Sequence, residues 1–380
     1  MGDPAGTTIF TTMTALAERT GAINLGQGFP DEDGPASVIE AAVEALRAGH
    51  NQYAPLAGIP ALREAIAAHQ LRHYGIELDP ETQVQVTFGA TEALAAALLA
   101  LVRPGEEVAM LDPSYDSYAA VVRLAGGRPR PIPLAPPGWR VEPGPVEETI
   151  SERTRVLLVN SPHNPTGRVL DVGELDLLAD ACRRHDVLAL TDEVYEHLVY
   201  DGEHIPLASR PAMAERTITV SSLGKTHSFT GWKIGWASGP PELVAAVRGV
   251  KQFLTFAGGT PLQHAAAAAL EGSGGEAAAL AASLARRRDR LAAGLSAAGF
   301  DVLHSAGTYF LSADARPLGF DDAVPLCERL PHEAGVVAIP LSAFVAPPVD
   351  RVRSLVRFAF CKRDGVLAEA VERIRGWSPR

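Results

Sequence analysis

An α/β fold is predicted for this chain, with a large domain built on a mostly parallel sheet flanked by helices, plus a smaller α+β domain. The first observation is a strand–turn–helix pattern that repeats from residue 84 to residue 222. The second is a change after about residue 275, where a long Ala- and Arg-rich helix precedes short strand-like runs. The third is that the strand-like runs are short, mostly apolar and rich in strand formers, which indicates a largely parallel, buried sheet.

Each predicted element has a local reason. Helical spacing and good helix formers predict two helices, at 36–48 and 60–73, before the sheet begins. Short apolar runs then predict the strands, and the longer periodic segments between them predict the helices that connect them. The strands are expected at 84–89, 106–112, 155–161, 187–195 and 216–222, with helices at 90–102, 119–126 and 174–185. The smaller domain is expected to hold a helix at 276–299 and strand-like runs within 301–314, 336–344 and 354–361.

Composition excludes several classes of protein. The formal net charge of −11 over 380 residues argues against a nucleic acid or an anionic membrane surface as the main partner. The three cysteines are odd in number and widely spaced, so neither a disulfide framework nor a metal-ligand cluster is expected. The start of the chain lacks the pattern of a signal peptide, and the longest apolar run, at 93–102, is too short for a membrane span. The cytoplasm is the expected location.

Lysine is scarce in this chain, and two of the lysines lie close together. Only four lysines stand against thirty arginines, and Lys225 and Lys233 both fall within SSLGKTHSFTGWKIGW at 221–236. Arginine stays protonated under ordinary conditions, whereas a lysine amine can lose its proton and attack a carbonyl group. We therefore hypothesise that Lys225 is kept for amine chemistry; chance placement of four lysines is the alternative.

Ligands of open α/β sheets bind beyond the carboxyl ends of the strands, so the residues there are the candidate site residues. The first such strand leads into Gly89, Ala90 and Thr91, which open a helix. A turn of small residues before a helix presents free backbone N–H groups and suits a phosphate. The alternative is that Thr91 is only the N-cap of that helix.

Three further strand ends carry polar side chains. Asn164 follows the first of them within PHNPTG, where asparagine is also an ordinary turn residue. Asp192 and Glu193 end the next strand, and because neighbouring residues point to opposite faces, at most one of them faces the crevice. Ser222 and Lys225 follow the third. Each residue alone has an ordinary explanation.

Taken together, these strand ends match the needs of pyridoxal phosphate. That cofactor needs a lysine for its aldehyde, an acid for its pyridine nitrogen, hydrogen-bond donors for its phenolic oxygen and a cradle for its phosphate. The successive strand ends deliver an amide, an acid and a lysine to one rim of one sheet, beside a phosphate-binding helix start. No zinc-like, P-loop or nucleophile-elbow pattern competes, and no metal is expected.

The chain also resembles a known family along nearly its whole length. The matching segments, in family order and spacing, are NLGQGFPDEDG, NQYAPLAGIPALREAIA, VTFGATEAL, DPSYDSY, NSPHNPTG, TDEVYEHL, SSLGKTHSFTGWKIGW, GTYFL and LVRFAFCKRD. They resemble the class I/II aminotransferases of the fold-type-I pyridoxal phosphate family. The greatest similarity is to N-succinyldiaminopimelate aminotransferases and to the kynurenine/glutamine subgroup.

The resemblance implies a role for each matching cofactor residue. Lys225 corresponds to the lysine that bonds the cofactor aldehyde, and Asp192 to the acid that pairs with the pyridine nitrogen. The remaining cofactor positions are the phenolic-oxygen partners Asn164 and Tyr195, the ring-stacking Tyr115, and the phosphate-binding Gly89, Ala90, Thr91, Ser222 and Lys233. Tyr53 corresponds to a tyrosine that reaches the phosphate from the partner subunit, which implies a homodimer with shared active sites.

The substrate residues are implied in the same way. Arg357 corresponds to the arginine that grips the substrate α-carboxylate, and Asn164 and Gly28 are the other expected substrate-binding residues. Arg357 interrupts an apolar run, where an unpaired charge is costly, and a planar donor suits a carboxylate. Gly28 either brings the backbone close to the substrate or only allows a turn. Phe29, Tyr309 and Phe256 are further candidates for shaping the pocket.

The implied function is a pyridoxal phosphate-dependent aminotransferase that moves an amino group from an amino acid to a 2-oxo acid by ping-pong kinetics. N-succinyl-LL-2,6-diaminopimelate with 2-oxoglutarate is one substrate pair. Kynurenine, glutamine and methionine are alternative donors, and a cysteine-conjugate β-lyase is an alternative reaction. The ligand-sensing domain of a transcriptional regulator is a non-enzymatic alternative, which the acidic charge disfavours.

Three parts are expected along the chain. Residues 36–275 form the large cofactor-binding domain and residues 276–380 form the small α+β domain. Residues 1–35 are too few to fold alone, so they are expected to pack with the small domain.

Overall fold

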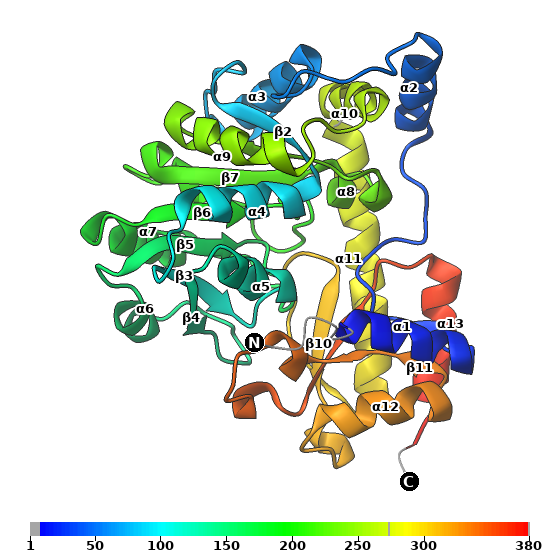
Figure 1. Cartoon of the computed structure of the whole chain (residues 1–380). Coiled ribbons are helices and arrows are strands. Elements are labelled where there is room, and N and C mark those ends of the chain that lie inside the picture. The colour runs from blue at the N-terminus through cyan, green and yellow to red at the C-terminus, as the bar shows by residue number, and fades with distance from the viewer. Residues whose placement is uncertain (1–7, 273, 379–380) are drawn as a thin grey trace.

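A seven-stranded sheet forms the centre of the larger part of the molecule (Figure 1). The protein is described here by a computed structural model, which covers residues 8–272 and 274–378. The strand order is β2-β8-β7-β6-β5-β3-β4, and all neighbouring strands are parallel except at β8, which is antiparallel to both β2 and β7. The strands are β2 (Val84–Phe88), β3 (Glu107–Asp112), β4 (Arg128–Pro133), β5 (Thr154–Asn160), β6 (Leu188–Asp192), β7 (Thr217–Ser222) and β8 (Ile234–Ser238).

Helices cover both faces of this sheet. Alternate residues of a strand point to opposite faces, so Val108 and Met110 of β3 enter one core while Ala109 and Leu111 enter another. The helices around the sheet are α4 (Gly89–Leu101), α5 (Asp116–Leu124), α6 (Pro143–Thr149), α7 (Val172–Arg184), the single-turn α8 (Leu223–Thr226) and α9 (Pro241–Leu254). A further core joins β2 and β8 to α2 (Ala36–Arg47), α3 (Pro60–Tyr74) and α10 (Thr260–Gly272).

The C-terminal part of the chain forms an antiparallel sheet with helices beside it. Its strand order is β12-β13-β10-β9, with β9 (Asp301–Val302), β10 (Phe310–Asp314), β12 (Ile339–Pro340) and β13 (Leu355–Ala359). The helices are α11 (Gly274–Ala297), which runs from the larger part into the smaller one in Figure 1, α12 (Ala323–Glu333) and α13 (Asp364–Arg375). No described helix combines the length and the apolar character that crossing a bilayer demands.

The N-terminal segment lies against this C-terminal part (Figure 1). The short β1 (Ile23–Asn24) pairs in parallel with β11 (Val336–Val337), and α1 (Ile9–Thr20) contacts α12 and β11. These contacts concern residues 9–24, and residues 1–7 of the expected 1–35 segment lie outside the part of the chain that the structure describes. The three-part division at residues 35 and 275 stays a proposal.

The α/β prediction is confirmed, and the differences concern strands with unusual sequences. β4, in RPRPIP, was not expected, because proline cannot donate to a ladder; it is tolerated since β4 is an edge strand that pairs only with β3. α5 begins at Asp116, three residues before the expected helix at 119–126. The antiparallel β8 was not expected either, although it follows directly on the lysine stretch.

Candidate active site

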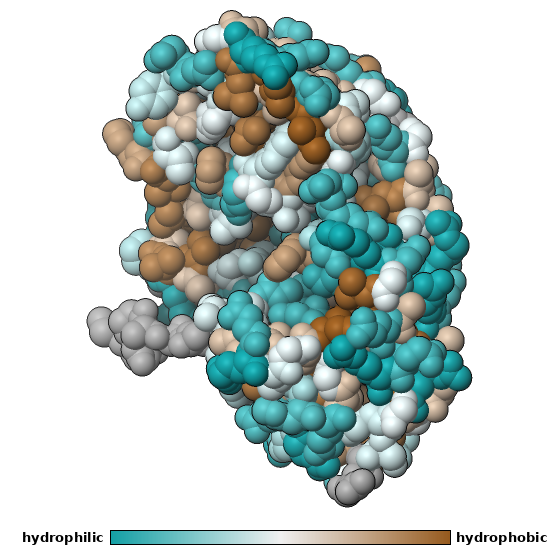
Figure 2. Space-filling model, turned by 90° about the vertical axis from the view of Figure 1, so that its right-hand side faces the viewer, coloured by the Kyte–Doolittle hydropathy of each residue, from teal (hydrophilic) through white to brown (hydrophobic). Residues whose placement is uncertain are grey.

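The largest concentration of predicted site residues surrounds one cavity of about 410 Å³ at the carboxyl ends of the parallel strands. The N-terminal segment and the C-terminal sheet complete its walls, and the surface is hollowed between the two parts of the molecule (Figure 2). The predicted residues that line it are Gly28, Gly89, Ala90, Thr91, Tyr115, Asn164, Asp192, Tyr195, Ser222, Lys225, Lys233 and Arg357. Of the residues with an implied cofactor or substrate role, Tyr53 alone lies outside this lining, and the pocket candidates Tyr309 and Phe256 lie outside it too.

Lys225 enters the cavity from α8, which begins directly after β7 ends at Ser222. Its Nζ lies 3.4 Å from the carbonyl oxygen of Gly28, and 5.8 and 5.6 Å from the ring centres of Tyr195 and Tyr309. Burial among these groups lowers the pKa of Lys225 from 10.5 to about 8. A substantial fraction of this amine is therefore neutral, and nucleophilic, just above neutral pH.

Asp192 is the acid that faces the cavity. Its Oδ2 accepts a hydrogen bond of 2.6 Å from the hydroxyl of Tyr118, and its burial raises the pKa of the carboxyl above its ordinary value. Glu193 points the other way, where Thr191 and His204 hydrogen-bond its carboxylate at 2.7 and 2.8 Å. The alternation expected at this strand end is thus observed, and a cationic group beside Asp192 would offset the cost of burying its charge.

Two asparagines tie the neighbouring strand end to Asp192. Asn160 donates from Nδ2 to the backbone oxygen of Asp192 at 2.8 Å and accepts from the backbone N–H of Asn164 at 2.7 Å. Asn164 in turn accepts a hydrogen bond of 3.1 Å from Arg357. Sequence reasoning missed Asn160, because its register opposite Asp192 across β5 and β6 is set only in the packed sheet.

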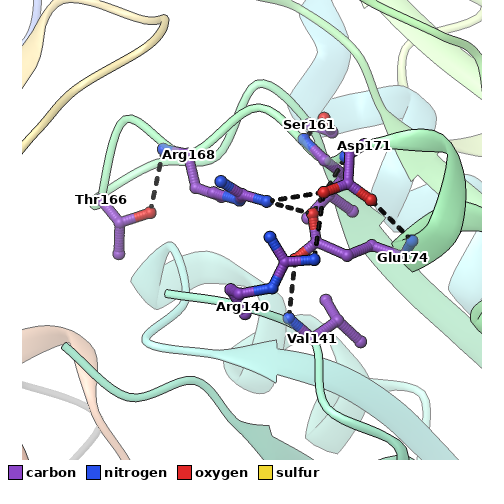
Figure 3. Close-up of polar contacts among 8 residues, drawn as sticks. Arg140, Val141, Ser161, Thr166, Arg168, Asp171 and Glu174 are labelled. Carbon is purple, nitrogen blue, oxygen red and sulfur yellow. Dashed lines mark hydrogen bonds and ion pairs between the residues drawn. The ribbon is translucent and has the colours of Figure 1, made fainter. Parts of the chain in front are cut away.

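A polar network holds the loop that carries Asn164 (Figure 3). Asp171 caps α7 by accepting from the backbone N–H of Glu174 at 3.0 Å, and the Glu174 carboxylate accepts in return from the backbone N–H of Asp171. Arg168 forms ion pairs with both acids, and Ser161 accepts from the backbone N–H of Leu170 at 3.2 Å. This capping box and ion pair fix both ends of the loop on the large sheet.

Replacing Glu174 by glutamine is expected to lower the free energy of unfolding by about 2 kcal/mol, because the buried charge partner of Arg168 is lost. The measurement is urea unfolding at a fixed protein concentration. Glu148→Gln on the exposed face of α6 is the matched control and should change stability by less than about 0.5 kcal/mol. Equal effects of the two substitutions would contradict the role of this network.

The start of α4 forms an anion cradle with Lys233. Gly89 has a φ of +75°, and a Cβ atom there would lie 3.0 Å from the Lys233 Nζ, so glycine is required for the lysine to lie over the helix start. Phe88 occupies the N-cap position, and no side chain caps the helix. The idea that Thr91 is only an N-cap is therefore wrong, since Thr91 lies within the first turn. Free N–H groups and an amine at a helix start suit a phosphate.

Arg357 on β13 closes the opposite side of the cavity. Its side chain is 0 % exposed and lies between the rings of Phe310 and Phe344, 4.0 and 4.4 Å from their centres. It donates to Asn164 Oδ1 and to the backbone oxygen of Gly26 at 2.8 Å.

No carboxylate among residues 8–272 and 274–378 forms an ion pair with Arg357, and its Nε has no hydrogen-bond partner there. Burial lowers the pKa of Arg357 to about 10. A buried cation that has only neutral acceptors is poised for an anionic ligand.

The aromatic candidates divide into two groups. Phe29 lines the cavity, and Tyr309 lies behind Lys225 and donates to the carbonyl oxygen of Gly28. Gly28 itself is packed so closely that a Cβ would lie 2.4 Å from Phe310, which makes tight packing the reason for glycine at this position. Tyr53 is 83 % exposed and contacts Phe256 edge to face, so neither of these two lines the cavity within its own chain.

Comparison with known proteins identifies the family. The model of the family "Aminotransferase class I and II" matches residues 20–374. The chain belongs to this aminotransferase family. A curated relative from Mycobacterium tuberculosis, "Probable N-succinyldiaminopimelate aminotransferase DapC", is 52 % identical over 98 % of this chain and 96 % of its own. The methionine aminotransferase of Escherichia coli is 43 % identical over 97 % of this chain and 96 % of its own.

Solved structures of aminotransferases have the same fold. The N-succinyldiaminopimelate aminotransferase from Mycobacterium tuberculosis superposes with a TM-score of 0.96 at 53 % identity, over 98 % of this chain and 97 % of that one. A mutant aspartate aminotransferase from Thermus thermophilus superposes with a TM-score of 0.90 at 36 % identity, over 98 % and 97 % of the two chains. The prediction of an aspartate aminotransferase-like fold is confirmed.

Aminotransferases of this family depend on pyridoxal phosphate, and the residues of this cavity fit that cofactor. The amine of Lys233 lies against Gly89, where no Cβ intervenes, and so brings a positive charge to the start of α4, as a phosphate requires. The buried Asp192 carboxylate suits a protonated ring nitrogen. The partly neutral amine of Lys225 suits an aldehyde.

Proposed function

We propose that this aminotransferase takes the amino group of N-succinyl-LL-2,6-diaminopimelate and passes it to 2-oxoglutarate, a step of diaminopimelate and lysine biosynthesis. The observation that carries the proposal is the 52 % identity, over nearly the full length of both chains, to a relative named for this donor. Methionine is the second candidate donor, because the methionine aminotransferase is 43 % identical over a similar length.

We propose the following cofactor roles for the residues of the cavity. Lys225 bonds the cofactor aldehyde, Asp192 pairs with the ring nitrogen, and Tyr115 covers the ring. Asn164 and Tyr195 hydrogen-bond the phenolic oxygen. The phosphate is held at the start of α4 by Gly89, Ala90 and Thr91, together with Ser222 and Lys233. Support comes from the common cavity and from the free N–H groups of the first turn of α4.

Pyridoxal phosphate, when bound, supplies an aldehyde and an electron sink for the electrons left on the substrate Cα. Arg357 binds the α-carboxylate and thereby orients the Cα–H bond toward Lys225. Lys225 would remove the proton from the substrate Cα as a general base and, as a general acid, would deliver it to the cofactor carbon that bore the aldehyde. Asp192 stabilises the positive charge on the ring nitrogen by its own negative charge. Tyr118 keeps this carboxylate in place through its 2.6 Å hydrogen bond.

The rate at which cofactor-free protein takes up pyridoxal phosphate covalently should depend on pH. Lys225 attacks only as the neutral amine, and burial lowers its pKa to about 8, so the protonated, inactive form dominates below this pH. The second-order rate should rise about tenfold per pH unit below pH 8 and level off above it. Stopped-flow absorbance measures this profile. A rise that continues to pH 10, where ordinary lysines titrate, would contradict the lowered pKa.

Substitutions at the phosphate cradle test whether Lys233 contributes only its positive charge and whether Gly89 is needed for cofactor binding. Lys233→Arg should leave a working enzyme, because this position needs only a positive charge. Gly89→Ala should weaken cofactor affinity about 10- to 100-fold, because the new Cβ meets Lys233 and the φ of +75° becomes strained. Fluorescence titration of the cofactor-free proteins gives the dissociation constants. Cofactor affinity in Gly89→Ala equal to that of the wild type would contradict the cradle.

The donor is tested by single-turnover reactions of the cofactor-loaded enzyme with N-succinyl-LL-2,6-diaminopimelate, methionine, kynurenine and glutamine. The fastest loss of the absorbance of the lysine-bound cofactor, at equal low concentrations, identifies the preferred donor. We expect N-succinyl-LL-2,6-diaminopimelate to react at least about tenfold faster than methionine, which corresponds to ~1.4 kcal/mol of discrimination. Preference for methionine would overturn the proposed donor and leave the aminotransferase activity intact.

We further propose a homodimer in which Tyr53 reaches the cofactor phosphate of the partner subunit. Its support is a group of exposed apolar and aromatic side chains, of which Tyr53 and Phe253 are 83 % and 85 % exposed and Phe256 is 43 % exposed. Large exposed aromatics of this kind are typical of interfaces between subunits.

We also propose that the protein is located in the cytoplasm. Its three cysteines are buried and free, as expected in a reducing compartment.

A further inference from the structure

Three histidines form a cluster that the transamination site does not use. His69 and His73 lie one turn apart on α3, and His197 lies in the loop after β6. The centres of the three rings are 4.6, 4.9 and 4.8 Å apart in pairs. One ring nitrogen of each histidine lies within 4.8 Å of the nitrogens of the other two. Residues four apart on a helix share one face, so both α3 histidines can meet a third ligand.

We propose that His69, His73 and His197 form a binding site for one divalent transition-metal ion of the class that prefers imidazole, with zinc as the representative. Three neutral imidazoles with an open fourth position are a known zinc ligand set, whereas calcium and magnesium prefer oxygen ligands. The site is independent of the proposed amino donor.

The open coordination position has room for water or another ligand. His73 and His197 also line a second cavity of about 480 Å³, whose far wall is a row of alanines near the start of α11. Alanine side chains offer no competing ligand. The cavity therefore leaves the face of the histidine cluster accessible to an ion from solvent.

A second observation is a buried ring nitrogen that lacks a partner. His69 is 1 % exposed, and its Nδ1 has no hydrogen-bond partner in the part of the chain that the structure describes. An unsatisfied buried polar atom in a native protein calls for an explanation such as a bound ion. A 180° turn of the imidazole exchanges Nδ1 with Cδ2 and Nε2 with Cε1, so the ring can present Nδ1 on its other side without a shift of the backbone.

The present hydrogen bond between two of the ligands would be replaced on metal binding. The Nε2 atoms of His69 and His197 are 2.6 Å apart. Two nitrogens that each lie about 2.0–2.1 Å from one tetrahedral zinc ion are roughly 3.3 Å apart, so the rings would have to separate by less than ~1 Å. His197 lies in a loop and His73 is exposed near the end of α3, where such a shift is easily made.

The surrounding charges favour a cation on balance. The buried carboxylate of Glu196 acts on His69 and His73 from the side of the sheet, and it accepts hydrogen bonds from Tyr74 and Ser221. Arg72 on α3 opposes it, but its guanidinium is directed to the backbone oxygen of Leu270. Glu196 also links the cluster to the active site, since it follows Tyr195 in the chain and contacts the strand that leads to Lys225.

The test uses the untagged, cofactor-loaded enzyme after treatment with a chelator and dialysis. Isothermal titration with zinc chloride should show one saturable site per chain, and cobalt(II) should acquire the visible absorption of a tetrahedral nitrogen site. His73→Gln should weaken zinc binding by more than about 100-fold, which exceeds the loss typical of removing a supporting group. His197→Gln should do the same.

His332→Gln is the matched control, since His332 is an exposed helical histidine on α12. It should bind zinc as the wild type does, and zinc should raise the melting temperature of the wild type and of this control but not of His73→Gln. Because His73 is exposed, its substitution should leave the metal-free melting temperature unchanged. Absence of saturable binding to the wild type would overturn the proposal, as would unchanged zinc affinity in both ligand variants.

Discussion

Replacement of Lys225 by alanine should lower the rate of transamination by about 10⁴-fold or more and abolish the absorbance of the lysine-bound cofactor. The same amine bonds the cofactor and moves the proton at the substrate Cα, so its loss removes both functions. The other lysines have other places: Lys233 lies against Gly89 at the start of α4, and the amines of Lys251 and Lys362 donate to the backbone oxygens of Phe256 and Phe29.

The informative comparison is Lys225→Arg with Lys233→Arg. Arginine keeps a positive charge at both positions but cannot lose its proton at ordinary pH. Lys225→Arg should therefore be as inactive as Lys225→Ala, whereas Lys233→Arg should retain cofactor binding and turnover. Steady-state rates and absorption spectra of all three proteins show which lysine bonds the cofactor and which supplies only a positive charge. Loss of cofactor binding only in Lys233→Arg would mean that the two roles are reversed.

Replacement of Arg357 by lysine should reduce kcat/KM for amino acid donors by about 100- to 1000-fold, or ~3–4 kcal/mol. This is the expected value of two charge-assisted hydrogen bonds to a carboxylate, which a lysine amine cannot reproduce in the same plane. Steady-state kinetics with the preferred donor and with 2-oxoglutarate measure the loss, which should appear mainly in KM for both substrates. The cofactor spectrum should be unchanged.

Since Arg357 is buried between two aromatic rings, a structural effect of its substitution has to be separated from lost recognition. A primary amine that lacks the α-carboxylate serves as the control substrate. This amine should react with the wild type and with Arg357→Lys at rates within about threefold of each other, because it has no carboxylate for residue 357 to bind in either protein. An equal loss for the amine and the amino acid would show that the substitution damages the site rather than carboxylate binding.

The large sheet could be predicted because short runs of apolar and β-branched residues indicate buried strands. β5 and β6 are mostly apolar, β7 is rich in β-branched residues, and each strand ends in polar residues. Both the existence of these strands and the edge at which the polar residues collect therefore follow from the pattern. β4 was not predictable, because its prolines oppose a strand and only its position at the edge of the sheet permits one.

Within the candidate site, the limits of prediction have a similar cause. The sequence predicted that Asn164, Asp192 and Lys225 lie close together, because parallel strands place their carboxyl ends on one rim of the sheet. The contact of Arg357 with Asn164 could not be predicted, because it joins residues 193 positions apart and forms only when the two sheets pack together. Tyr118 and Asn160 were missed for the same reason, since their sequence surroundings resemble those of ordinary helix and strand residues.

The sequence alone determined the fold class, the family and many of the residues that surround the cavity, because each depends on residue type and on order along the chain. Tertiary structure decided which acid faces the cavity, how far burial lowers the pKa of Lys225, that Arg357 has no counter-ion among the described residues, and that three histidines from two distant segments meet. These properties depend on distance and on desolvation between elements, and both arise only when the elements pack against one another.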